Sequence, residues 1–177
     1  EDYVGDWVAT AVWPPSVPGN AAGAPTLPGR LRLASKSLFF EPDDPRCPIA
    51  RLPLAATTRL EAVPGTDSTA FEVVATAVTR MKADNADGPY GFDRFEGDRS
   101  GGGGGPRDAP SAPLLPPPTW RFTLPYASLE AVLPSAHTYL AASRLPYGDR
   151  AAALADLAAR RVSAATFDPS RLADYGE

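Results

Sequence analysis

Hydrophobic and polar residues alternate in short runs along much of the chain. Leu31 and Leu33 alternate with Arg30 and Arg32, which is the period of two that a half-buried strand shows. The alternation is clearest over Thr119–Leu124, where three apolar side chains are separated by polar ones. Seven strands are predicted on such grounds: Asp2–Trp13, Gly29–Leu33, Leu38–Phe40, Ile49–Leu54, Thr57–Val63, Ala70–Lys82 and Thr119–Leu124.

Helical periodicity appears only after the last strand. Apolar residues from Leu129 to Leu140 recur three, four, seven and eleven positions after the first, which gives one apolar stripe along a helix. Pro134 lies inside this pattern, so we expect a bend or a late start there. A second helix is expected from Asp149, as its N-cap, to about Val162.

The predicted fold is therefore mainly β with C-terminal helices. It is a seven-strand antiparallel sandwich or barrel capped by one helix, with a second short helix after it. Phe40, Trp120 and Phe122 from the strands and Leu133 from the first helix are expected to be buried together in its core.

Two stretches hold many of the 21 prolines and 15 glycines of the 177-residue chain. Segments this rich in proline and glycine lack the apolar content that would offset their chain entropy. We therefore expect one domain over residues 1–145 with disordered inserts at about 14–28 and 84–118. Residues 146–177 are expected to form a helical extension that packs on this domain or leads to a next one.

Several short motifs between the two proline-rich inserts carry a family resemblance. They are GRLRL (Gly29–Leu33), SKSL (Ser35–Leu38), FEPD (Phe40–Asp43), PI (Pro48–Ile49) and LPL (Leu52–Leu54). These motifs resemble the N-terminal region of FAN, the factor associated with neutral sphingomyelinase activation, in the BEACH-domain family. A second match, Phe167-Asp168 with Arg171-Leu172, resembles the Phe-Asp…Arg-Phe of the same region. The resemblance implies a pleckstrin-homology-like (PH-like) domain, the GRAM variant included, in a large intracellular scaffold linked to membrane traffic and signalling.

Net charge, cysteine content and the length of the apolar runs limit which partners and which cellular compartment the protein can have. A formal charge of −4 does not favour nucleic acid or an anionic membrane, so an anion site would need a local basic patch. The single cysteine, Cys47, cannot form a disulfide within the chain, which favours a cytoplasmic location. No apolar run approaches the ~20 residues of a membrane span. Because the chain begins with Glu1 and shows no signal-peptide pattern, we expect a piece of a longer protein.

No catalytic, metal or cofactor site can be assembled from the motifs, so we expect no enzyme. Gly101–Gly105 is followed by proline instead of Lys-Ser or Lys-Thr and is interpreted as a linker. Glu41, Asp43 and Asp44 have no calcium-loop spacing and are interpreted as a turn. His137 has no nucleophile elbow near it and is interpreted as a surface histidine.

One group of basic residues remains as a candidate binding site. Arg30 and Arg32 share a strand face, Lys36 follows at the turn, and Arg51 lies on a later strand. The arginine pair resembles the x-basic-x-Arg pattern of phosphoinositide-binding PH domains, but no basic residue precedes it on the first strand. Two roles stay open: weak attachment to anionic phospholipid at a membrane periphery, or docking onto proteins or other domains of the same scaffold. A solvated charged strand face without a ligand is the third interpretation.

Overall fold

The computed structural model describes residues 1–17, 25–65, 69–81, 92–94 and 116–165. Within these residues the chain forms nine strands, two α-helices and one 3-10 turn. The strands are β1 (Tyr3–Val12), β2 (Thr26–Ala34), β3 (Ser37–Pro42), β4 (Ile49–Pro53), β5 (Thr57–Ala62), β6 (Ala70–Ala75), β7 (Thr79–Met81), β8 (Phe92–Arg94) and β9 (Thr119–Thr123). The helices are α1 (Leu129–Ser143) and α2 (Tyr147–Ala165), and the 3-10 turn is η1 (Leu54–Ala56).

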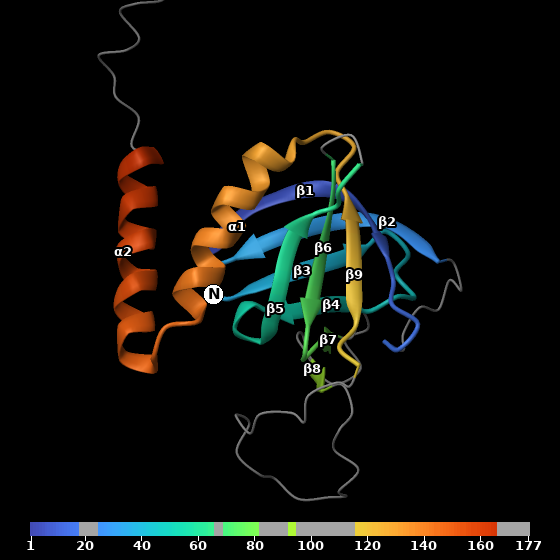
Figure 1. The fold of residues 1–177 in the computed structure, drawn as a ribbon, viewed down its shortest axis with the longest axis horizontal. Coiled ribbons are helices and arrows are strands. Elements are labelled where there is room, and N and C mark those ends of the chain that lie inside the picture. Colours follow the sequence, from blue (N-terminus) through green and yellow to red (C-terminus); the bar gives the residue numbers. More distant parts are fainter. Residues whose placement is uncertain (18–24, 66–68, 82–91, 95–115, 166–177) are drawn as a thin grey trace, which may run out of the picture.

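All strand pairs are antiparallel, in the order β5-β6-β9-β1-β2-β3-β4-β7-β8. In Figure 1, β5, β6 and β9 run steeply across β1 to β4, so the sheet bends over on itself. The two halves are joined where Thr10–Val12 of β1 pairs with β9. Helix α1 lies at the open end between the halves, beside β5 and η1. This arrangement confirms the PH-like fold, and β7 and β8 are short additions at one edge.

The predicted strand over Ala70–Lys82 is divided in two. Its first part, β6, pairs with β5 and β9, whereas β7 pairs with β4 in the other half of the sheet. The chain turns between them at Thr76, whose backbone N–H and hydroxyl both donate to the carbonyl of Ala56, at 2.8 and 3.1 Å. The apolar content of the segment indicated a strand but gave no sign of this change of partner.

The core lies between the two halves of the sheet and α1. Phe40 of β3, Trp120 and Phe122 of β9 are fully buried, as predicted. The ring centroid of Phe122 lies 5.8 Å from that of Phe40, which places the two halves of the sheet in contact. Leu133 is only partly buried, because it lies at the margin of the helix face that packs against the core.

Helix α1 begins at Leu129, so the late start considered at Pro134 does not occur. Helix α2 is 19 residues long and starts before Asp149, so it is longer than the short helix expected. It stands beside α1 (Figure 1), and Leu154 is its buried contact with the core cluster. Neither described helix is long and apolar enough to cross a membrane.

The two predicted inserts are described only in part. Residues 14–17 form a turn instead of a disordered segment: Val17 is 2% exposed, its N–H donates to the carbonyl of Pro14, and its carbonyl accepts from Trp13 Nε1 at 2.6 Å. Residues 26–28 belong to β2, and residues 92–94 form β8. Residues 18–24, 84–91 and 95–115 of the inserts lie outside the described residues.

Candidate ligand-binding face

The predicted basic residues lie on the solvent side of the first half of the sheet. Along β2, Arg30 and Arg32 are exposed while the alternating residues are buried. Arg32 pairs with Phe39 of β3, and Phe39 pairs with Arg51 of β4. Arg32 and Arg51 therefore lie in one row across three strands. We call this surface, with Lys36 at the β2–β3 turn, the β2–β4 outer face.

The two arginines of β2 are held in ion pairs with neighbouring strands. Arg30 Nη1 lies 2.9 Å from Asp6 Oδ2 on β1, and Arg32 Nη2 lies 2.8 Å from Glu41 Oε2 on β3. Their side chains remain about half exposed, at 57% and 46%. Water therefore screens both pairs, and each guanidinium still reaches the solvent.

Asp6 also holds the exposed tyrosine at the start of β1. The hydroxyl of Tyr3 donates to Asp6 Oδ1 at 2.6 Å. This hydrogen bond lowers the pKa of Asp6, and the Arg30 guanidinium lowers it further. The same hydrogen bond raises the pKa of Tyr3, because losing the proton would place two anions in contact. Asp6 therefore stays ionised as the partner of Arg30.

Arg51 has a more elaborate environment than the other arginines. Its guanidinium lies over the ring of Phe39, 5.9 Å from the ring centroid, in a cation–π contact. Its Nε donates to the hydroxyl of Ser37 at 2.9 Å, and its Nη2 donates to the carboxylate of Glu1. The Ser37 hydroxyl in turn donates to the same Glu1 oxygen at 3.1 Å. Two donors thus converge on one carboxylate oxygen.

Lys36 is the cation of this face whose side chain has no ion pair within the described part of the chain. It is exposed at the β2–β3 turn, between the buried Ser35 and Ser37. The face thus has four cations against the three carboxylates of Asp6, Glu41 and Glu1, an excess of one positive charge. The sequence indicated the cations but not their partners.

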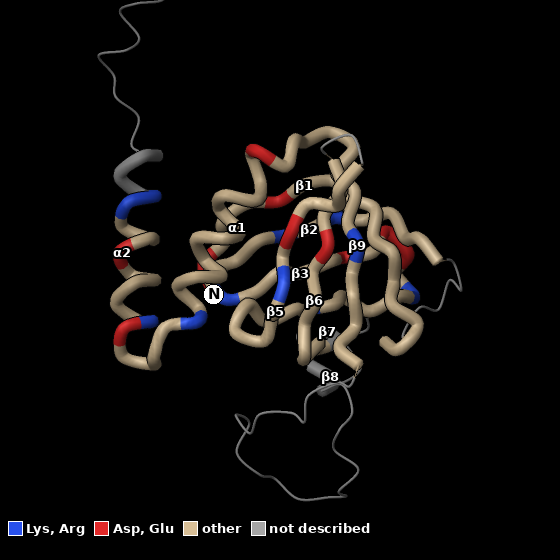
Figure 2. The backbone as a smooth tube through the Cα atoms, in the orientation of Figure 1, with Lys and Arg blue, Asp and Glu red and all other residues tan. Residues whose placement is uncertain are grey.

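Charges of both signs also alternate on the other half of the sheet (Figure 2). Glu72 of β6 accepts from Arg59 of β5 at 3.2 Å and from Arg121 of β9 at 2.7 Å. The register places Glu72 directly opposite Arg121 of β9, whereas Arg59 of β5 lies opposite Val74 and reaches Glu72 diagonally. This group offers a matched comparison for the β2–β4 outer face, because its arginines are exposed and paired in the same way.

The remaining candidates from the sequence are engaged in local structure. Asp44 accepts from the backbone and guanidinium of Arg46, which lowers its pKa to about 2 and makes it part of a turn. Cys47 is buried, and His137 Nε2 lies 2.8 Å from the carbonyl of Leu60 at the free edge of β5. Among the described residues, no group of three or more His, Cys, Asp and Glu side chains could hold a metal ion.

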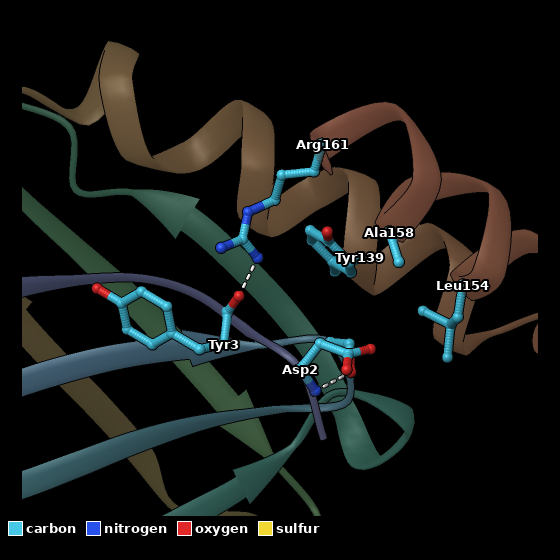
Figure 3. Close-up of a pocket in the computed structure, with 7 residues that line it drawn as sticks. Asp2, Tyr3, Tyr139, Leu154, Ala158 and Arg161 are labelled. Carbon is cyan, nitrogen blue, oxygen red and sulfur yellow. Dashed lines mark hydrogen bonds between the residues drawn. The ribbon is translucent and has the colours of Figure 1, made fainter. Parts of the chain in front are cut away.

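A small cavity of about 290 Å³ separates α2 from the start of β1 (Figure 3). Tyr139 of α1 and Leu154 and Ala158 of α2 give it apolar walls. Arg161 closes one side: its Nη1 donates to the backbone carbonyl of Tyr3, and its guanidinium lies 5.8 Å from the centroid of the Tyr3 ring. The helix predicted up to about Val162 includes this arginine near its end, but the sequence gave no signal of its contact with β1.

The comparisons with known proteins agree with this architecture. The family model described as the FAN protein N-terminal PH domain matches residues 1–99. No curated protein and no solved structure matches the chain. The matched residues include β1 to β8 and the whole β2–β4 outer face. The second motif of the sequence comparison, Phe167-Asp168 with Arg171-Leu172, lies outside both the matched and the described residues.

Proposed function

Because the chain belongs to the family of FAN protein N-terminal PH domains, we propose that it is a non-catalytic PH/GRAM-like module of a BEACH-type scaffold. In this proposal it serves membrane-associated traffic or signalling in the cytoplasm and at the membrane periphery. It contributes by weak binding of anionic phospholipid through Arg30, Arg32, Lys36 and Arg51. The observation that carries the proposal is the position of Arg30, Arg32 and Arg51 on one side of three neighbouring strands, with Lys36 exposed at the adjoining turn.

The expected affinity is low. A basic residue near an anionic membrane surface contributes about 1 kcal/mol, and this contribution falls off within a Debye length. Three of the four cations are already partnered by carboxylates, so the face presents less charge than its arginines and lysine suggest. Binding by this module would therefore need other membrane contacts of the same scaffold, which raise its effective concentration at the surface.

Vesicle co-sedimentation tests the proposal. Vesicles of phosphatidylcholine with phosphatidylinositol phosphates should sediment the chain at low salt and release it at high salt. The Arg30→Ala/Arg32→Ala double variant should lose this binding. The Arg59→Ala/Arg121→Ala double variant removes the same charge from the other half of the sheet and should keep it. No sedimentation of the unsubstituted chain at low salt, or equal losses in both variants, would contradict the proposal.

Protein docking is the second candidate function, and a different observation favours it. Val8 and Val12 on the outer side of β1 are 48% and 39% exposed, next to the paired charges of Asp6 and Arg30. An apolar strip beside mutually neutralised charges suits a protein surface better than an anionic membrane. The partner would be another domain of the scaffold or a trafficking or signalling protein. Failure of the vesicle assay, with binding in a pull-down of scaffold domains that Val8→Asp abolishes, would favour this function.

A further inference from the structure

The contacts of Arg51 have the form of an anion site that is already occupied. The hydroxyl of Ser37 and the Nη2 group of Arg51 both donate to Oε1 of Glu1. A serine hydroxyl and a guanidinium that converge on one oxygen form a typical arrangement for binding a phosphate or a carboxylate. The Glu1 carboxylate is the anion that fills this arrangement in the present structure.

The two donors are held in place independently of Glu1. Ser37 is fully buried at the start of β3, where it pairs with Pro53 of β4. Arg51 is fixed by its Nε hydrogen bond to Ser37 and by its contact with the ring of Phe39. Because these contacts do not involve Glu1, they should persist when the carboxylate leaves, so the site is preorganised for an anion.

Glu1 differs from the other carboxylates of the face in how it is attached. Asp6 lies within β1 and Glu41 within β3, so the strand pairing holds their backbones in place beside the arginines. Glu1 precedes β1. The next residue is anchored, because the N–H of Asp2 donates to the hydroxyl of Ser35 and the carbonyl of Asp2 accepts from the N–H of Ser35. Glu1 can therefore withdraw from Arg51 by a movement of its own backbone and side chain that leaves the sheet intact.

From these contacts we infer that Arg51 and Ser37, with Lys36 beside them, form a phosphate-monoester site that Glu1 blocks in competition with the ligand. A phosphate monoester carries more negative charge than a carboxylate and offers three acceptor oxygens, so it can satisfy both donors and also attract Lys36, which has no ion pair among the described residues. The inference deepens the proposed function and rests on it for the lipid headgroup as the source of the phosphate. A soluble inositol phosphate carries the same chemistry without a membrane.

Competition by Glu1 makes a quantitative prediction. The apparent affinity of a site falls by the fraction of molecules in which it is open. A part-buried ion pair of this kind shifts such an equilibrium modestly, so Glu1→Gln should tighten phosphate-ester binding about threefold to tenfold. Asp2→Asn is the matched control: it removes the same charge one residue away, and the Asp2 contacts that hold the chain use its backbone. It should leave the affinity nearly unchanged.

The experiment uses the whole chain and two probes. Soluble inositol bisphosphate is titrated while the Nε resonance of Arg51 is followed by NMR, and vesicles with phosphatidylinositol monophosphate are used for co-sedimentation. We expect the Arg51 Nε signal to shift on titration and the inositol bisphosphate to bind more tightly to Glu1→Gln than to Asp2→Asn. Vesicles should likewise sediment more of Glu1→Gln than of Asp2→Asn. Arg51→Gln should abolish binding of both probes, and the NMR spectrum of this variant should retain the dispersion of a folded sheet.

The outcomes separate this inference from the proposed function. Vesicle binding that is equal in the unsubstituted chain and in Glu1→Gln would overturn the inference and leave lipid binding in place. A Glu1-dependent shift of Arg51 Nε without vesicle binding would support the phosphate site and contradict the lipid headgroup as its ligand. Equal gains in Glu1→Gln and Asp2→Asn would indicate a general charge effect and overturn the inference. No shift of Arg51 Nε in any variant would overturn it as well.

Discussion

Phe122 is the residue whose removal should test the packing most directly. It is fully buried on β9, and its ring lies 5.4 Å from Phe71 and 5.8 Å from Phe40, centroid to centroid. Phe122→Ala would remove apolar contact with both halves of the sheet at once and leave a cavity between them. Truncating a buried phenylalanine costs about 3–5 kcal/mol, and the aromatic contacts favour the upper part of that range.

Urea denaturation followed by tryptophan fluorescence measures this cost, because Trp120 packs on the Phe122 ring at 6.1 Å and reports on the same region. Tyr126→Ala is the matched control, since that aromatic side chain is 85% exposed and should cost less than about 0.5 kcal/mol. The slope of the transition should be equal in all three proteins. A loss below about 1 kcal/mol for Phe122→Ala would show that the ring faces solvent and that the register of β9 is wrong.

Three further predictions follow from single contacts. Gly29→Ala would place a Cβ 2.2 Å from the backbone oxygen of Glu41, so β2 and β3 would have to separate. The free energy of unfolding, measured in urea, should fall by about 3 kcal/mol, the upper end of the usual cost of overpacking, and an unchanged midpoint would contradict the pairing. The Arg46 contact lowers the pKa of Asp44 from 3.8 to about 2, so its stabilisation is present above pH 4 and lost as the pH falls toward 2. The difference in thermal stability between the unsubstituted chain and Asp44→Asn should therefore shrink over that range, and a constant difference would refute this. Leu154→Ala should speed amide exchange in α2 while the sheet stays protected; equal acceleration in both would mean that α2 unfolds with the sheet.

Much of the fold could be predicted because its signals are local. The alternation at Arg30–Leu33 and at Thr119–Leu124 requires one buried face per strand, and the structure buries the expected one. The break near Thr76 could not be predicted, since both segments have strand-forming side chains and only distant partners tell them apart. The turn at Pro14–Val17 was missed for a related reason: its stability depends on Trp13 and the core, not on its own composition.

The candidate site shows the same division between local and distant signals. The cations could be recognised by their spacing, and Glu41 could have been added, because a tight turn at Ser35–Lys36 places it opposite Arg30. Asp6 and Glu1 come from a separate strand and from the chain before it, so no spacing rule links them to the arginines. These unpredicted carboxylates decide how much charge the face presents to a ligand.

The position of β9 in the sheet determines how the protein can be divided. β9 is the last strand along the chain, and the interval between β8 and β9 is the longest between consecutive strands. It nevertheless lies between β6 and β1, near the middle of the sheet. A truncated chain ending with the matched region at residue 99 would lack β9 and α1 and would leave β1 and β6 as unpaired edges prone to association. The two halves would then have no shared strand, so cooperative folding must wait until Thr119–Thr123 has been synthesised. Expression of this domain therefore requires a boundary beyond Ser143, well past the end of the family match.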